Sequence, residues 1–301
     1  MTAAPSRHSH VFLGAGHQRN ERRTWAVIWL CAAMMIAELT GGLLFGSIAL
    51  VADGLHMSTH AGALLLAALA YTYAHKHAED PRFSFGTGKL GDLAGFTSAI
   101  ILAMIALLIG YEAITRILQP VRIHFAEAIP IAAVGLAVNV VSAWLLMEQP
   151  DHHHHDHGHD HAHRDNNMRA ATVHVLADAA VSVLVITGLL LAHAFGWLWM
   201  DPFAGIIGAI VIASWSLGLI RDTGAVLLDM NPDHHLADHL RRVIEAGGDS
   251  IADLHLWRLG PGHLGAIVSI NTATTRGPEH YRQRLAGFHG LSHLTIEVER
   301  V

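Results

Sequence analysis

The chain has 301 residues, of which 52% are hydrophobic and only 15% are charged. Soluble domains usually carry about 25% charged residues, so this balance favours a protein embedded in lipid. A net charge of −6 and the lack of a long basic stretch argue against nucleic-acid binding. The single cysteine, Cys31, excludes both a disulfide framework and a cysteine-built zinc site. The 26 histidines exceed what packing or catalysis requires.

The first apolar segment follows a polar stretch, residues 1–23, that contains four arginines. No apolar core stands where a cleavable signal peptide would have one. We therefore expect residues 1–23 to form a cytoplasmic tail and the first apolar run to be retained.

Six apolar segments reach the roughly 20 helical residues that a bilayer core about 30 Å thick requires. They are Thr24–Phe45, Ser47–Tyr73, Leu90–Ala113, Ala126–Met147, Met168–His193 and Trp197–Ile220. A buried soluble helix can look similar, but six such runs in one chain favour membrane spans. The sequence therefore predicts an all-α, six-helix transmembrane domain over residues 24–221.

Basic residues gather on one side of these predicted spans. The loops after spans one and five carry none, and the loop after span three carries Arg116 and Arg122. The opposite side has the N-terminal arginines, the basic C-terminal part, and Lys76, Arg82, Lys89, Arg164 and Arg169. By the positive-inside rule, we expect both termini to be cytoplasmic and the protein to lie in a plasma membrane, the inner membrane of a bacterium.

From residue 222 the apolar runs become short and turn signals return. Helices are predicted at Pro232–Ala246 and Pro278–Gly287. Strands are predicted at Ile251–Leu259, Leu264–Thr272 and Leu291–Val301, with Pro261 and Gly262 breaking the first two. We expect residues 222–301 to form a small cytoplasmic α+β domain with a ferredoxin-like fold.

Ionisable residues inside membrane spans are costly and are functional candidates by default. The second span contains His56 and His60, and the fifth contains His174 and Asp178. Each pair has i, i+4 spacing, which places both side chains on one helix face about 5–6 Å apart. Two such faces would supply the four ligands of a tetrahedral metal site, and imidazole suits zinc, cobalt, nickel and copper. A lone histidine of this kind is often a hydrogen-bonded packing residue, but two pairs favour metal binding.

Three further polar residues lie within the predicted spans. Asp53 stands three residues before His56, where it could accept a hydrogen bond from a ligand histidine or place charge in a vestibule. Glu38 and Asn139 could line an ion path, and hydrogen bonding between helices explains them equally well.

A histidine-rich run, DHHHHDHGHDHAHRD, connects the fourth and fifth spans at residues 151–165. Its composition cannot build a core, but it can bind transition metals weakly at many points. We expect it to gather or sense metal on the cytoplasmic side, the alternative being a solvated linker. Its histidines are His152, His153, His154, His155, His157, His159, His161 and His163.

Several motifs together resemble the cation diffusion facilitator family of metal efflux transporters. They are ADGLHM in the second span, RFSFGTGKLGDLAGF entering the third, GLAVNVVSAWLL in the fourth, HVLADA in the fifth, and DLHLW and HLTIEVE in the C-terminal part. The resemblance implies a homodimeric antiporter that exports divalent ions in exchange for protons. It maps the intramembrane metal site onto His56, His60, His174 and Asp178, with the metal as cargo and no prosthetic group.

The family's usual zinc-exporting pattern has aspartate where this chain has His60. This departure, with GTGKLGDLAGF and WLWMDPFAGIIGA, resembles the branch that exports cobalt and nickel. Zinc and cadmium are possible further cargo of such an exporter, and a zinc exporter of the same family is the alternative. An intramembrane metalloenzyme is disfavoured because no H-E-x-x-H motif occurs. A membrane metal sensor would explain the histidine run but not six spans with ligand pairs.

Overall fold

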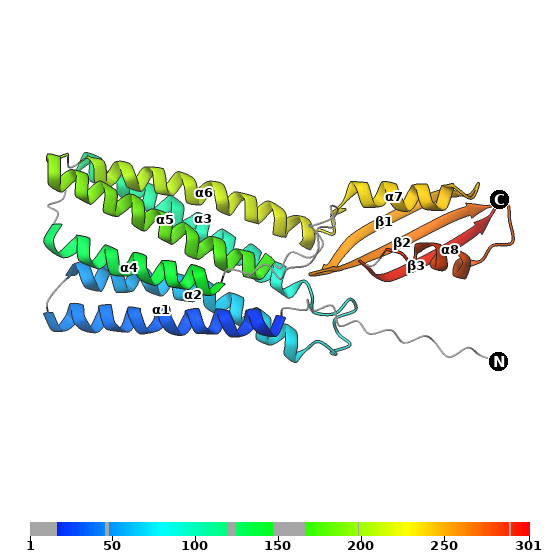
Figure 1. Ribbon diagram of the computed structural model, residues 1–301, viewed down its shortest axis with the longest axis horizontal. Helices are drawn as coiled ribbons and strands as arrows, with labels where there is room; N and C mark the ends of the chain where they lie inside the picture. The colour runs from blue at the N-terminus through cyan, green and yellow to red at the C-terminus, as the bar shows by residue number, and fades with distance from the viewer. Residues whose placement is uncertain (1–16, 46–47, 120–124, 147–165, 198, 289) are drawn as a thin grey trace.

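We describe the protein from a computed structural model, which describes residues 17–45, 48–119, 125–146, 166–197, 199–288 and 290–301. At Glu38 and over residues 41–60, no side chain is described. Figure 1 shows a bundle of long helices with a smaller domain of helices and strands beyond one end. We call this the domain-proximal end of the bundle, and the opposite end the distal end.

Six helices of 22 to 30 residues form the bundle in the described parts of the chain. They are α1 (His17–Phe45), α2 (Ile48–Lys76), α3 (Leu90–Leu118), α4 (Phe125–Leu146), α5 (Asn166–Phe195) and α6 (Met200–Leu227). Stretches of α3, α4, α5 and α6 are long and apolar enough to cross a membrane. The prediction of six spans is thus confirmed for four helices, and for α1 and α2 it stays a prediction.

Most helices extend beyond the predicted spans, and α1 and α6 do so by the most residues. Helix α1 begins at His17, and α6 runs to Leu227, past the predicted boundary at residue 221. Hydropathy falls where a helix leaves lipid, but the backbone hydrogen bonds of the helix continue into the polar sequence. Hydropathy alone therefore underestimates the length of the helix. In the α6 extension, Asp222 forms an ion pair with Arg169 near the start of α5.

Helix α5 contributes to each of the main apolar clusters of the bundle. Its residues Ala171 and Val175 pack in a cluster with side chains of α1, α2 and α4. On another face, Ala170 and Ala177 pack against α3 and α6. These contacts place α5 between the two groups of helices, as Figure 1 also shows.

Small residues bring α3 and α6 close together. A Cβ atom added at Gly205 of α6 would come within 3.2 Å of the Ala113 Cβ atom on α3. A side chain there would force the helices apart, which is the general reason small residues are enriched between membrane helices.

The C-terminal part forms an α+β unit whose elements confirm the predicted order. It contains α7 (His234–Glu245), β1 (Ser250–Gly260), β2 (His263–Thr272), α8 (Pro278–Leu285) and β3 (Leu291–Arg300). The sheet order is β1-β2-β3, with β2 antiparallel to β1 and parallel to β3. This three-stranded arrangement confirms the α+β class but does not establish the ferredoxin-like fold, which stays a prediction.

An apolar core lies between the sheet and its two helices. Leu240 and Ile244 of α7 and Tyr281 and Leu285 of α8 pack in it with Val268 of β2, and all five are nearly inaccessible to solvent. Helix α7 is amphipathic, and its first turn is capped by Asp233, which accepts a hydrogen bond from the Leu236 backbone N–H at 3.0 Å.

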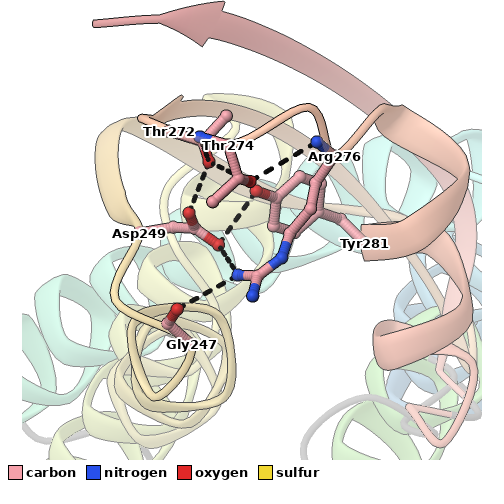
Figure 2. Close-up of polar contacts among 6 residues, drawn as sticks. All are labelled: Gly247, Asp249, Thr272, Thr274, Arg276 and Tyr281. Atoms are coloured by element: carbon pink, nitrogen blue, oxygen red, sulfur yellow. Dashed lines mark hydrogen bonds and ion pairs between the residues drawn. The ribbon is translucent and has the colours of Figure 1, made fainter.

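A buried carboxylate, Asp249, joins the strands to α8 (Figure 2). It accepts hydrogen bonds from the Thr272 hydroxyl at 2.6 Å and the Tyr281 hydroxyl at 2.9 Å. The Arg276 guanidinium lies 2.9 Å from it and also donates to the Gly247 carbonyl. The Thr272 hydroxyl, with further contributions from Tyr281 and Arg276, holds the pKa of Asp249 below its ordinary value.

The C-terminal domain contacts the bundle through the loop between α2 and α3. The Phe85 ring lies edge-on to Trp257 of β1 and His293 of β3, with ring centroids 5.7 and 5.4 Å away. The Trp257 ring lies on Gly265 of β2, where a Cβ atom would meet it at 2.6 Å. In addition, Lys89 beside the start of α3 pairs with Asp229 after α6. Apolar and ionic contacts therefore both hold this end of the bundle.

We expect Tyr281→Phe to destabilise the C-terminal domain by about 1.5–3 kcal/mol, because it removes one hydrogen bond to a buried charged carboxylate. Hydrogen exchange of the β1 and β2 amides in the full-length protein measures this loss. The control is Tyr111→Phe, at an exposed position on α3, which should leave the exchange unchanged. Equal protection in Tyr281→Phe and the parent would contradict the assigned role of this hydroxyl.

Acid should weaken the same domain through Asp249. Because its pKa is lowered in the folded state, the ionised carboxylate stabilises the fold in full above its unfolded pKa of about 3.9. This stabilisation is lost as the pH falls through the lower folded pKa. In Asp249→Asn the domain should be less stable at neutral pH, and its amide protection should fall less steeply in acid. Identical acid slopes for variant and parent would rule out this carboxylate as the cause.

Candidate metal site on helix α5

Two of the predicted ligands, His174 and Asp178, lie together on α5. The His174 side chain is 2% exposed and that of Asp178 is 11% exposed. The His174 Nε2 and Asp178 Oδ2 atoms are 3.7 Å apart. Ligand atoms about 2.1 Å from a tetrahedral zinc-like ion lie about 3.4 Å from each other. The observed separation is therefore close to the distance between two atoms that bind the same ion.

The α-helical repeat explains where this pair points. Successive residues turn by about 100° around the helix axis. On this wheel, His174 and Asp178 fall between Ala170 and Ala177, which face α3 and α6, and Ala171 and Val175, which face α1, α2 and α4. The pair therefore lies on the α5 surface between the face that contacts α3 and α6 and the face that contacts α1, α2 and α4.

Other buried polar side chains come from α1 and α4. Asn139 is 9% exposed and Ser142 is fully buried, and both lie on the inner face of α4 three residues apart. The Cys31 thiol on α1 is also buried, and it interacts electrostatically with Ser142 and with the Asp178 carboxylate. The surroundings of Asp178 are thus partly polar, although the helices themselves are apolar.

Sequence reasoning missed Cys31 and Ser142 as neighbours of the pair. Cys31 stands in an apolar run of α1 and reads as a small hydrophobic residue. A signal for Ser142 was present, because it follows the predicted path residue Asn139 by three positions and so shares its helix face. That the Cys31 thiol interacts with Ser142 and with the Asp178 charge depends on how α1 packs against α4 and α5.

Several other predicted residues cannot be placed as ligands. His56, His60 and Asp53 lie in α2 and Glu38 lies in α1, but their side chains fall outside the described part of the structure. The eight histidines of residues 152–163 are outside the described residues altogether. Among the side chains that are described, no group of three or more His, Cys, Asp or Glu could hold a metal ion. The structure therefore shows the α5 pair, and the four-ligand set stays a prediction.

Comparison with known proteins identifies a family and several relatives. The model of the cation efflux transmembrane domain family matches residues 24–228. The zinc transporter ZitB of Escherichia coli is 33% identical, with 97% of this chain and 91% of that protein covered. The cadmium, cobalt and zinc/H(+)-K(+) antiporter of Bacillus subtilis is 31% identical, with 94% and 92% covered.

A third relative, the metal cation efflux system protein CzcD of Cupriavidus metallidurans, is 29% identical over 95% of this chain and 90% of its own length. These relatives do not single out a branch specific for cobalt and nickel, so only the broader part of the predicted resemblance is confirmed. The family match begins within α1 and covers all of α2 to α6, including the α5 pair. The chain belongs to the cation efflux family of membrane transporters.

Proposed function

We propose that this protein exports divalent transition-metal ions from the cytoplasm, holding one ion between His56, His60, His174 and Asp178. The observation that carries the proposal is the buried His174–Asp178 pair, whose ligand atoms lie 3.7 Å apart on a membrane-spanning helix. A carboxylate and an imidazole at this spacing are suitable ligands for a dication. Membership of a cation efflux family supports the direction of transport.

Helix α2 is the proposed source of the other two ligands. It packs against α5, and its residue Leu64 shares an apolar cluster with Val175 of α5. Position 60 precedes Leu64 by four residues and position 56 by eight, so from helical periodicity we propose that both face the bundle core. A site shared by two packed helices can be opened to either side by relative movement of those helices.

Three histidines and one aspartate would give the site a charge of about −1 with neutral imidazoles. A site with two histidines and two aspartates would carry about −2 and attract any dication more strongly. A larger share of nitrogen ligands favours later transition metals over magnesium, calcium and manganese. We propose cobalt and nickel as the main cargo, on the resemblance of His60 and its surrounding motifs. Zinc export is the second candidate, favoured by the names of the relatives.

Protons are the proposed counter-ion. Histidine and aspartate must be deprotonated to bind metal, so metal and protons compete for the same atoms. The unperturbed histidine pKa of about 6.5 suits such exchange near neutral pH. A relative from Bacillus subtilis carries proton and potassium antiport in its name, which supports counter-transport here.

The remaining parts of the chain have proposed supporting roles. Asn139 and Glu38 would line the ion path, and Asp53 would orient a ligand histidine or add charge at the path entrance. The histidine-rich segment would gather cytoplasmic metal before export. This proposal includes six spans, cytoplasmic termini and a homodimeric assembly in a bacterial inner membrane.

His174→Ala and Asp178→Ala should each abolish metal transport, because each removes one of two buried ligands on α5. The measurement is cobalt and zinc uptake into inverted membrane vesicles, with and without a pH gradient. The matched control is Glu112→Ala, which removes an exposed carboxylate of α3 and should leave uptake unchanged. Parental transport rates in a well-folded His174 or Asp178 variant would refute the site.

His60→Asp should shift preference towards zinc, because it adds a carboxylate and lowers the nitrogen share of the ligand set. We expect the ratio of cobalt to zinc transport to fall by about tenfold, which corresponds to 1.4 kcal/mol of differential binding. Purified protein in proteoliposomes, offered cobalt, nickel, zinc and cadmium separately, measures the ratio. If the ratio did not change, selectivity would lie outside residue 60.

Arg169→Ala should slow transport about two- to fivefold, since a partly exposed ion pair contributes up to about 1 kcal/mol. The pair with Asp222 ties the start of α5 to α6, five residues before His174. Exchanging the charges, Arg169→Asp with Asp222→Arg, should recover much of the rate. Recovery would show that the pairing matters, whereas a charge-exchanged protein as slow as Arg169→Ala would show that Arg169 acts by other contacts.

A further inference from the structure

A cavity of about 570 Å³ lies between α2 and α3, away from the His174–Asp178 pair. Its lining is almost entirely apolar and includes Leu66, Leu69 and Ala70 of α2 and Leu93 and Thr97 of α3. Leu69 and Leu93 are each 49% exposed, so the cavity opens to the outside of the bundle. Small-molecule sites typically measure about 300–1,000 Å³, and this volume falls within that range.

The polar lining groups stand towards the domain-proximal end of α2. Lys76 is the last residue of α2, and His77 follows it. The His77 ring stacks on Tyr73 with ring centroids 4.0 Å apart. From Leu66 to Lys76 the helix rises about 15 Å, which is half of a bilayer core about 30 Å thick. The cavity is therefore apolar over about one leaflet and cationic at its polar end.

The charge at this end is available to a ligand. Lys76 is exposed, and it forms no ion pair with any residue in the described parts of the chain. Two nearby carboxylates already have partners. Glu21 of α1 accepts a hydrogen bond from the Thr72 hydroxyl at 2.7 Å, and Asp80 holds Arg82 through a 2.7 Å ion pair. An anionic group beside Lys76 would therefore meet a cation that forms no ion pair with Glu21, Glu79 or Asp80.

We propose that this cavity binds a phospholipid with an anionic headgroup, one acyl chain lying along Leu66, Leu69 and Leu93 and the phosphate beside Lys76. The cavity faces the lipid that surrounds a membrane-spanning bundle, and its apolar length matches one leaflet. Basic pockets between membrane helices bind anionic headgroups in this way. A second copy of the chain packed against the cavity would explain its apolar walls. It would not explain why Lys76, at the polar end, forms no ion pair in the described parts of the chain.

The bound lipid would stabilise the spacing of α2 and α3. The loop that follows the cavity carries Phe85, which contacts Trp257 and His293 of the C-terminal domain. Lys89, at the end of the same loop, pairs with Asp229. A lipid seated between the two helices therefore acts on the segment that joins the bundle to the domain.

Native mass spectrometry of the full-length protein in detergent tests the proposal. The probes are phosphatidylglycerol and phosphatidylcholine with identical acyl chains. One lysine near an anionic lipid contributes about 1 kcal/mol, so the parent protein should retain phosphatidylglycerol about fivefold more strongly. Lys76→Gln should bring the two lipids to equal retention. The matched control, Arg22→Gln, removes an exposed cation of α1 that does not line the cavity and should keep the preference.

Two further variants fill the cavity from opposite walls, Ala70→Phe on α2 and Thr97→Phe on α3. Both lipids should be lost from each variant that elutes as a single species of parental size. Unchanged phosphatidylglycerol preference in Lys76→Gln would overturn the proposal. So would phenylalanine variants that retain lipid but shift from dimer to monomer, since that result would assign the cavity to a second copy of the chain.

Discussion

His174 and Asp178 are ionisable side chains held inside an apolar bundle, and the cost of burying them constrains the helices around α5. An aspartate at the centre of a membrane helix costs at least about 2.5–3.5 kcal/mol on insertion scales. In this structure the two side chains approach to 3.7 Å, and buried Asn139 and Ser142 lie on the neighbouring helix α4. The ion that we propose to bind there would offset more of this cost.

Small residues on α5 allow that arrangement. Ala170, Ala171 and Ala177 let α5 approach two groups of helices without gaps, whereas larger side chains would hold those helices apart. Close packing of this kind depends on van der Waals contact rather than on the hydrophobic effect, because lipid is as apolar as the helices. The same alanines therefore help to position His174 and Asp178 between the two groups of helices.

The domain-proximal end of the bundle is held by contacts of a different kind. Ion pairs link α5 to α6 through Arg169 and the start of α3 to Asp229 through Lys89, and Phe85 packs against the sheet of the C-terminal domain. The paired side chains are partly exposed, so these ion pairs form without the burial cost that applies near His174. The C-terminal domain keeps its own shape through an apolar core and the Asp249 network.

Periodicity and residue type by themselves determined much of this protein. The long apolar runs predicted the helices, because lipid thickness sets their length. The i, i+4 spacing predicted that His174 and Asp178 share a face, because that relation is local to one helix. Alternating apolar residues and the Pro261–Gly262 turn predicted the strands of the C-terminal domain, because these patterns are also local in the sequence.

Relations between distant segments required the tertiary structure. That Cys31 lies near Asp178, that Phe85 reaches Trp257, and that α2 and α3 leave a cavity lined by Lys76 are consequences of how whole helices pack. The ion pair between Asp222, in the extension of α6 to Leu227, and Arg169 of α5 is another such relation. The periodicity of the sequence indicates which face of each helix is buried. Which other helix packs against that face depends on the fit of all the side chains between the two helices.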